Sequence, residues 1–306
     1  MSDQLTQVMI RNFINYLPYA MAGIFAVAVV LRWAIYYTVR RHEWFAREFE
    51  KRVYKYLDQQ NHQTENSVSF YVLSKKLLEK TFYETFAVRD RKVSDNVDHV
   101  MTFSDRVFFI KQGCAWFVKF TLKQIKHLKW SKESPKLHTI TRSTLNHNPC
   151  FNKVFGIFPL GAVNDLVSIL PGLFVVAGIL GTFLGIKGGL VQLGGMDLTD
   201  VEASKNIMDS FLHEIGFAMA SSIVGIAFSL TLHLVNTSLS PDRVYTALVD
   251  RFESTLDLLW YRSDNNFLPE KIENFNENRD PAEALAEEAL QLEFTKSQKG
   301  LAQKSA

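Results

Sequence analysis

The sequence is poor in cysteine, the residue that forms the disulfides of small secreted domains and coordinates zinc in many structural sites. Its 306 residues include only two, Cys114 and Cys150. Two cysteines exclude a disulfide framework and a four-cysteine zinc site. We expect both to be free thiols, because they fall in a stretch assigned below to the cytoplasm. His138 and His147 precede Cys150, but their spacing matches no zinc motif, so no metal site is predicted.

An excess of charge of one sign is also missing. The chain has 34 basic and 32 acidic residues, which leaves a formal net charge of +2. A nucleic-acid partner usually requires a strongly basic surface, so none is predicted. The sequence contains no metalloprotease, serine-hydrolase or kinase motif, and the glycines before Lys187 lack the pattern of a phosphate-binding loop. We therefore expect a protein that is not an enzyme and needs no cofactor.

What the chain does have is three long apolar runs. They cover residues 17–38, 166–193 and 213–237. Each can cross a hydrocarbon core of about 30 Å, which takes roughly 20 helical residues. Arg32 lies close enough to the end of the first run to reach the headgroups, and Trp33, Tyr36 and Tyr37 resemble an interfacial belt. The late start and the basic helix that follows disfavour a signal peptide, so three membrane spans are predicted.

Charged residues flank these spans unevenly. The basic flanks contain Arg40, Arg41, Arg47, Lys51, Arg52 and Lys55 after the first span, and Arg243, Arg251 and Arg262 after the third. The loop 194–212 carries one lysine against four acidic residues. Basic flanks mark the cytoplasmic side. We therefore expect an external segment 1–16, a short external loop 194–212 and a cytoplasmic C-terminus.

The other residues are too polar to span a membrane. Helical spacing of apolar residues recurs over 43–58, 68–87 and 107–120 and predicts a cytoplasmic helical domain over residues 39–165, with no strand signal strong enough for a sheet. Within it, residues 131–150 are rich in Ser, Thr, Pro and Asn and predict a connector. Residues 238–263 predict a helical extension from Pro241 to about Tyr261, followed by a C-terminal tail, 264–306. The fold class expected is an all-α integral membrane protein with a cytoplasmic helical bundle.

Small residues recur at helical spacing in the second and third spans. They are Gly178, Gly181, Gly185 and Gly189 with Thr182 in the second, and Ala218, Ser221, Ser222, Gly225 and Ser229 in the third. Such faces let helices approach closely in a membrane. Two interpretations stay open. The hydroxyls of Thr182 and Ser222 bond back to their own helices, or they line a path for a proton or small cation, since a hydroxyl both donates and accepts.

Four further residues near the ends of these spans are singled out. Lys187 either extends to the headgroups or pairs with an acidic residue of 197–214 or of a neighbouring chain. Glu214 is either solvated at the headgroups or part of an entrance that concentrates cations. Asn164 is a candidate helix cap, and Pro171 is a candidate kink.

Two segments carry a resemblance to a known family. Gly178-Ile-Leu-Gly-Thr182-Phe-Leu-Gly185 resembles the GLLGT-x-x-G signature of the second span of ExbB and TolQ. Ser221-Ser222-Ile-Val-Gly225-Ile resembles the T-x-x-G-L motif of the third span. With three spans and a large loop after the first, the chain resembles the MotA/TolQ/ExbB superfamily of proton-channel subunits. The motifs cover about residues 165–240, and the topology extends the likeness to the whole chain.

The resemblance implies a homo-oligomeric ring, a pentamer, in the bacterial inner membrane. The ring would enclose two copies of a B-type subunit with one membrane helix and a protonatable Asp. The translocated ion would be a proton, and proton flow would drive rotation. Thr182 and Ser222 would face that Asp with Ser221 close by, and the glycines (Gly178, Gly181, Gly185 and Gly225) would let helices pack closely.

The sequence departs from ExbB in the third span. Phe217 stands where ExbB has a pore-facing Glu, and Ser222 replaces a Thr. Thr in the second span with Ser in the third resembles the A subunit of the Zorya anti-phage system. The function expected is therefore a stator subunit of an ion-driven motor, in a Zorya-like defence system. The alternatives are an ExbB/TolQ-type energiser of envelope processes and a non-conducting oligomeric scaffold.

Overall fold

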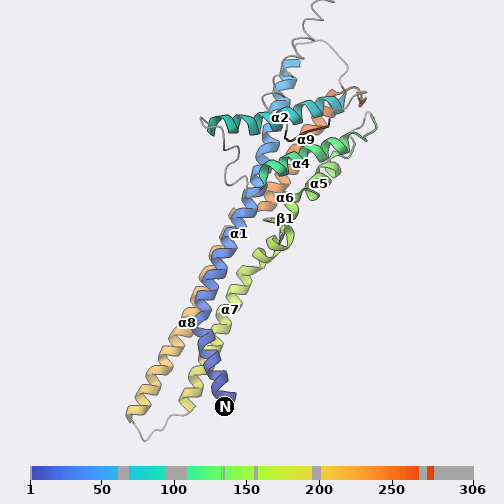
Figure 1. The fold of residues 1–306 in the computed structure, drawn as a ribbon. Coiled ribbons are helices and arrows are strands. Elements are labelled where there is room, and N and C mark those ends of the chain that lie inside the picture. The colour runs from blue at the N-terminus through green and yellow to red at the C-terminus, as the bar shows by residue number, and fades with distance from the viewer. Residues whose placement is uncertain are drawn as a thin grey trace, which may run out of the picture. The chain divides into compact units, whose positions relative to one another are not determined.

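The computed structural model of the chain describes residues 2–60, 69–93, 109–131, 133, 135–154, 158–194, 201–268 and 274–278. The chain divides into two compact units. The first comprises Met1–Tyr36 and Gly161–Ser240, and the second comprises Tyr37–Leu160 and Pro241–Ala306. Figure 1 labels their elements.

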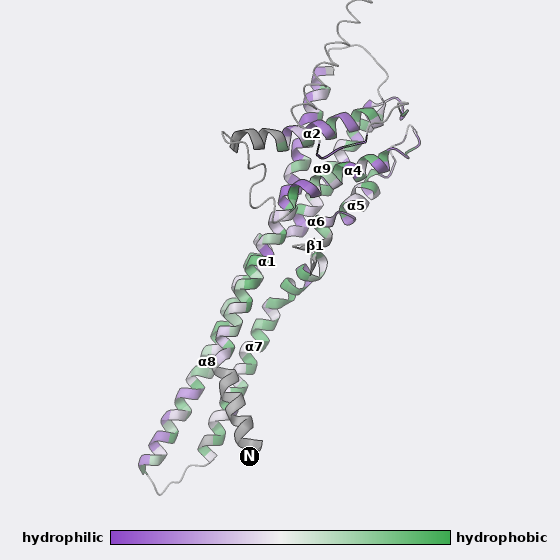
Figure 2. Ribbon diagram, viewed as in Figure 1, coloured by the Kyte–Doolittle hydropathy of each residue, from purple (hydrophilic) through white to green (hydrophobic). Residues whose placement is uncertain are grey.

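Three long helices carry the apolar runs of the sequence. They are α1 (Ser2–Gln60), α7 (Leu160–Gly194) and α8 (Val201–Ser238). Each is long and apolar enough to cross a membrane, and Figure 2 shows hydrophobic colouring along all three. The prediction of a helical chain with three helices long and apolar enough to span a membrane is confirmed. Helix α1 continues without a break through residues 43–58, and α8 begins at Val201, within the segment expected as an external loop.

One phenylalanine from each long helix meets at the core of the first unit. The rings of Phe25 and Phe228 stack with centroids 4.7 Å apart, and Phe174 lies 6.3 Å and 5.9 Å from them. Only 28 %, 28 % and 22 % of the three apolar windows are buried in the chain. Most of each apolar window is therefore exposed in the single chain, which is expected of helices that face lipid or other membrane helices.

The second unit is a helical bundle with an aromatic core. Besides part of α1 it contains α2 (Phe70–Val93), α4 (Ile110–Ile125), α5 (Leu137–Asn146), α6 (Pro149–Asn152) and α9 (Pro241–Arg262). Phe117 and Phe252 lie at its centre, with ring centroids 4.4 Å apart. A two-residue antiparallel pair, β1 (Lys153–Val154) with β2 (Phe158–Pro159), adds a short sheet that the sequence did not indicate.

The prediction of a connector over residues 131–150 is wrong, because α5 and the start of α6 lie within this segment. Leu137, Thr141, Thr144 and Leu145 are buried. Their spacing of three or four residues gives α5 one packed face, and α5 contacts both α4 and α9. Helical stability in proteins comes mainly from such packing, which here overrides the weak helix propensity of Ser, Thr and Asn.

Residues after α9 fasten the start of α2. The amide of Phe70 donates to the carbonyl of Asn265 at 2.8 Å, and the amide of Tyr71 donates to Oδ1 of Asn266 at 3.0 Å. Further on, the ring of Phe275 lies 5.2 Å from that of Phe82. The predicted tail 264–306 is therefore packed where it is described. Its part from Pro281 onward lies outside the described residues.

Candidate functional site

Glycines bring the backbones of α7 and α8 together. A Cβ built on Gly178 would lie 3.1 Å from the Cα of Ser222. A Cβ built on Gly225 would lie 2.6 Å from the carbonyl oxygen of Phe174. Backbone atoms cannot give way as a side chain can, so these two positions need the absence of a side chain.

The same contact continues along both helices toward the loop that joins them. A Cβ on Gly181 would lie 2.5 Å from Oγ of Ser221, and one on Gly185 would overlap the Cβ of Ala218. Gly189 lies against an aromatic ring of α8. The glycines predicted for helix packing thus lie along one seam between α7 and α8.

Thr182 and Ser222 face each other across this seam. Oγ1 of Thr182 lies 2.9 Å from Oγ of Ser222, 3.1 Å from the carbonyl oxygen of Gly178 and 3.2 Å from that of Ala218. One hydroxyl proton cannot serve three acceptors at once. Since each hydroxyl both donates and accepts, either one can be the donor in this contact. Both residues fall within one helical turn of the midpoint of their predicted spans.

Ser221 takes a different position. Its side chain is fully buried, and its Oγ donates to the carbonyl of Ala218 in its own helix at 2.7 Å. Ser222, one residue further, is only half-buried. Of the three residues predicted for the ion pathway, the structure brings Thr182 and Ser222 together and packs Ser221 inside the seam.

Lys187 and Glu214 are not brought together. Lys187 is exposed, and the described residues offer it no ion pair. Glu214 turns toward α7 instead, with Oε2 3.5 Å from the position of a Cβ on Gly188. Within the described part of the chain, the pairing predicted for Lys187 is therefore not seen. Pairing with a neighbouring chain stays a prediction.

A polar network that sequence reasoning missed joins the three long helices within the first unit. Nη1 of Arg32 donates to Oδ1 of Asn164 at 2.7 Å, and Nη2 donates to the carbonyl of Asn236 at 2.9 Å. Nδ2 of Asn236 donates to the carbonyl of Val167 at 3.1 Å. Arg32 is only 4 % exposed, so its side chain is packed among the three long helices.

The same network corrects the role assigned to Asn164. Helix α7 begins at Leu160, so Asn164 lies inside the helix and does not cap it. A signal for the network was present in the sequence. Arg32, Asn164 and Asn236 each lie at the end of a span that the charge pattern assigns to the cytoplasmic side, and polar groups at one depth of a membrane bundle are expected to pair.

The residues considered for a metal stay apart. His138 contacts Glu253, with Nδ1 2.8 Å from Oε2. Among the residues that the structure describes, no three His, Cys, Asp or Glu side chains form a metal-binding group. Both cysteines are buried free thiols, which confirms the prediction that they form no disulfide.

Comparison with models of known protein families and with curated proteins finds no match to this chain.

Proposed function

We propose that this protein is the channel-forming A-type subunit of a proton-driven motor of the MotA/TolQ/ExbB kind. The observation that carries the proposal is the contact between Thr182 and Ser222. Two hydroxyls 2.9 Å apart lie near the middle of two candidate membrane helices, in a seam where glycines bring the helices close together. A hydroxyl both donates and accepts hydrogen bonds, so a pair at this depth can pass a proton or hold a water in an otherwise apolar wall.

The chain needs a partner to move protons. Its predicted spans contain no acidic residue away from their ends, since Glu214 stands at the start of the third. The titrating carboxylate must then come from another protein. We propose a B-type subunit whose single membrane helix carries an Asp, two copies of which lie inside a pentamer of this chain in the bacterial inner membrane.

The exposed faces of the long helices support an assembly of this kind. On α7, the side chains of Leu173, Val176, Leu180 and Phe183 share one face and are between 46 % and 68 % exposed. Such a surface is stable only against lipid, another copy or a partner helix. The unequal ratio of subunits is testable by purifying the native complex through a tag on this chain and measuring its mass.

Proton flux through the purified complex tests the proposal. The complex is reconstituted in liposomes that contain a pH-sensitive dye, and a membrane potential is applied. Thr182→Ala combined with Ser222→Ala should lower the flux by at least about tenfold, as expected when a polar relay is lost, while subunit composition stays unchanged. Full flux in a correctly assembled double variant would exclude the pathway.

A non-conducting scaffold is the second candidate. It is favoured by the 3.1 Å contact of Thr182 with the carbonyl of Gly178 in its own helix, a bond that needs no ion. Thr182→Val keeps the shape of the side chain and removes the hydroxyl, whereas Thr182→Ser keeps the hydroxyl. If the protein is a scaffold, both variants keep its cellular function. If it forms a proton pathway, only Thr182→Ser keeps that function.

For the process that the motor powers, we propose anti-phage defence. The support is Thr182 in the second span with Ser222 in the third, the combination that resembles the Zorya A subunit, while Phe217 in place of an acidic residue sets the chain apart from ExbB. Deleting the gene in its host should raise the plating efficiency of phage. Unchanged plating with impaired uptake or envelope function would favour an ExbB/TolQ-type energiser instead.

A further inference from the structure

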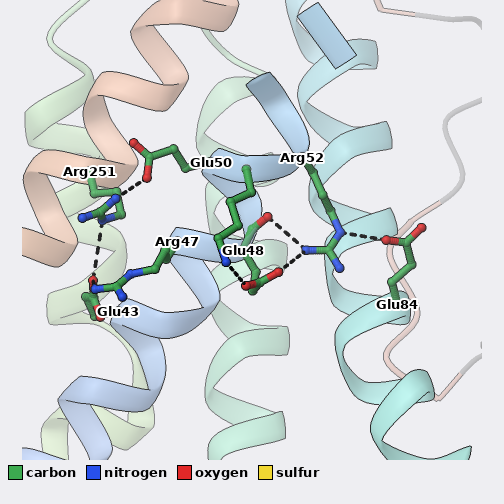
Figure 3. Close-up of polar contacts among 8 residues, drawn as sticks. Glu43, Arg47, Glu48, Glu50, Arg52, Glu84 and Arg251 are labelled. Atoms are coloured by element: carbon green, nitrogen blue, oxygen red, sulfur yellow. Dashed lines mark hydrogen bonds and ion pairs between the residues drawn. The ribbon is translucent and has the colours of Figure 1, made fainter. Parts of the chain in front are cut away.

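Arginines crowd two carboxylates in the second unit, just beyond the first predicted span (Figure 3). The nearly buried carboxylate of Glu43 lies 2.7 Å from Arg47, 3.3 Å from Arg40 and 3.6 Å from Arg251. Arg251 also pairs with Glu50. Three guanidinium groups thus share two carboxylates, and the cluster keeps a net positive charge.

Arg41 stands apart from this cluster in what it contacts. Its guanidinium carbon lies 4.5 Å from the centroid of the Trp44 ring. Arg40, Arg47 and Arg52 on the same helix each contact a carboxylate, whereas no described carboxylate pairs with Arg41. Stacking on an aromatic ring holds a guanidinium in place. Nε of Arg41 is buried, which leaves the two terminal nitrogens of the guanidinium to bind an anion in a bidentate manner.

The position of Arg41 along α1 indicates which anion it meets. The first predicted span ends at residue 38, so Arg41 lies about one helical turn, ~6 Å, beyond Tyr37. Trp and Tyr side chains prefer the headgroup layer of a bilayer. At this depth the abundant anion is the phosphate of a phospholipid, and the neighbouring arginine cluster adds attraction for a headgroup with a net negative charge.

We propose that Arg41, held by Trp44, binds the phosphate of an anionic phospholipid. The site is independent of the proposed proton pathway, because it uses neither Thr182 nor Ser222. The planar guanidinium supplies two N–H donors to the phosphate oxygens. Binding would stabilise the protein in membranes rich in phosphatidylglycerol.

Native mass spectrometry of the full-length protein tests this. The protein is released from nanodiscs that contain equal amounts of phosphatidylglycerol and phosphatidylcholine, and the phosphatidylglycerol that stays bound is counted. Arg41→Ala should lower the affinity for phosphatidylglycerol about tenfold, the change expected from losing one charge-assisted contact. Arg41→Lys keeps the charge but loses the two parallel N–H donors. Its affinity for phosphatidylglycerol should lie between those of the parent and of Arg41→Ala.

Lys55→Ala is the matched control, since it removes one positive charge from the same helix about 21 Å further along. It should retain phosphatidylglycerol like the parent. Equal retention by the parent and Arg41→Ala overturns the proposal, and so does an equal loss in Lys55→Ala. If Arg41→Ala does not fold, the comparison of Arg41→Lys with Lys55→Ala decides. Displacement of the lipid by millimolar inorganic phosphate would contradict a phospholipid and indicate a soluble phosphate ligand.

Discussion

The guanidinium of Arg32 donates a 2.7 Å hydrogen bond to the side-chain oxygen of Asn164, 132 positions away in the sequence. The bond joins α1 to α7, and the second N–H group of Arg32 reaches the backbone of α8. A charged side chain in a membrane helix is tolerated when its donors are satisfied by other helices. Arg32 therefore holds the three helices of the first unit together through its hydrogen bonds.

Replacing Arg32 should destabilise the first unit. Arg32→Met keeps much of the length of the side chain but leaves Oδ1 of Asn164 and the carbonyl of Asn236 without these donors. Both hydrogen bonds are only partly buried, so each lost bond costs about 1 kcal/mol. Thermal unfolding in detergent should show a lower midpoint for Arg32→Met than for Lys51→Ala, which removes an exposed ion pair. Equal unfolding midpoints would show that the hydrogen bonds of Arg32 contribute nothing to stability.

The seam between α7 and α8 should tolerate substitution only at certain glycines. Gly185→Ala places a methyl group on the Cβ of Ala218, whereas Gly172→Ala in the same helix meets no atom within 4 Å. We expect Gly185→Ala to be destabilised by about 1–3 kcal/mol through overpacking, and Gly172→Ala to be neutral or slightly stabilised. Paired unfolding measurements check this. An unchanged free energy of unfolding in Gly185→Ala would show that α7 and α8 can move apart to accommodate the methyl group without loss of stability.

The seam also shows what sequence alone can predict. Glycines at every fourth residue of an apolar run indicate close helix packing, because few other reasons place them there. The spacing cannot indicate the partner helix or the register. Register decides that Ser222 meets Thr182 while Ser221, one residue earlier, bonds to its own helix. These details depend on how two helices fit together, which no local pattern encodes.

Asn266 should stabilise the second unit well beyond what its place after the last helix suggests. Oδ1 accepts from the amide of Tyr71, and Nδ2 donates to the carbonyls of Leu128 at 2.8 Å and Ile125 at 3.3 Å. Asn266→Ala should cost about 1–3 kcal/mol. Asn278→Ala, at an exposed position, serves as the control. Hydrogen exchange at the first turn of α2 should rise only in Asn266→Ala, and unchanged exchange there would contradict the capping role.

Cys150 should be an unreactive thiol. Burial raises its pKa from 9.0 to about 11, although the hydrogen bond with the backbone of Gly113 acts in the opposite direction. The folded protein keeps this proton between pH 9 and about 11 while the unfolded chain loses it, so this contribution to stability falls as pH rises through that window. Below pH 9 the contribution is constant.

Alkylation kinetics measure this reactivity. In a Cys114→Ser background, iodoacetamide should label Cys150 slowly at pH 8, and the rate should rise about tenfold for each pH unit, since only the thiolate reacts. Labelling in denaturant gives the rate of the accessible thiol. Equal rates in the native and denatured protein at pH 8 would contradict the buried, protonated state.

Helix α5 and the segment after α9 mark the limit of local prediction. The composition of residues 131–150 is that of a loop, and α5 forms because Leu137 and Leu145 find a surface on α4 and α9. The polar residues Asn265 and Asn266 likewise gave no sign of capping a helix some 195 positions earlier in the chain. Both features depend on contacts between segments distant in sequence. The three apolar runs needed no such information, because length and hydropathy suffice.

A cryo-electron microscopy structure of the complex purified from native membranes tests the central claim most directly. The quantity to measure is the distance from Oγ of Ser222 to the nearest carboxylate oxygen of another chain. We predict a helix of a different protein inside a ring of this chain, with its carboxylate about 3 Å from the hydroxyl or about 5–6 Å away through one water. Thr182 and Ser222 facing lipid tails, or a ring that encloses no foreign helix, would contradict the account.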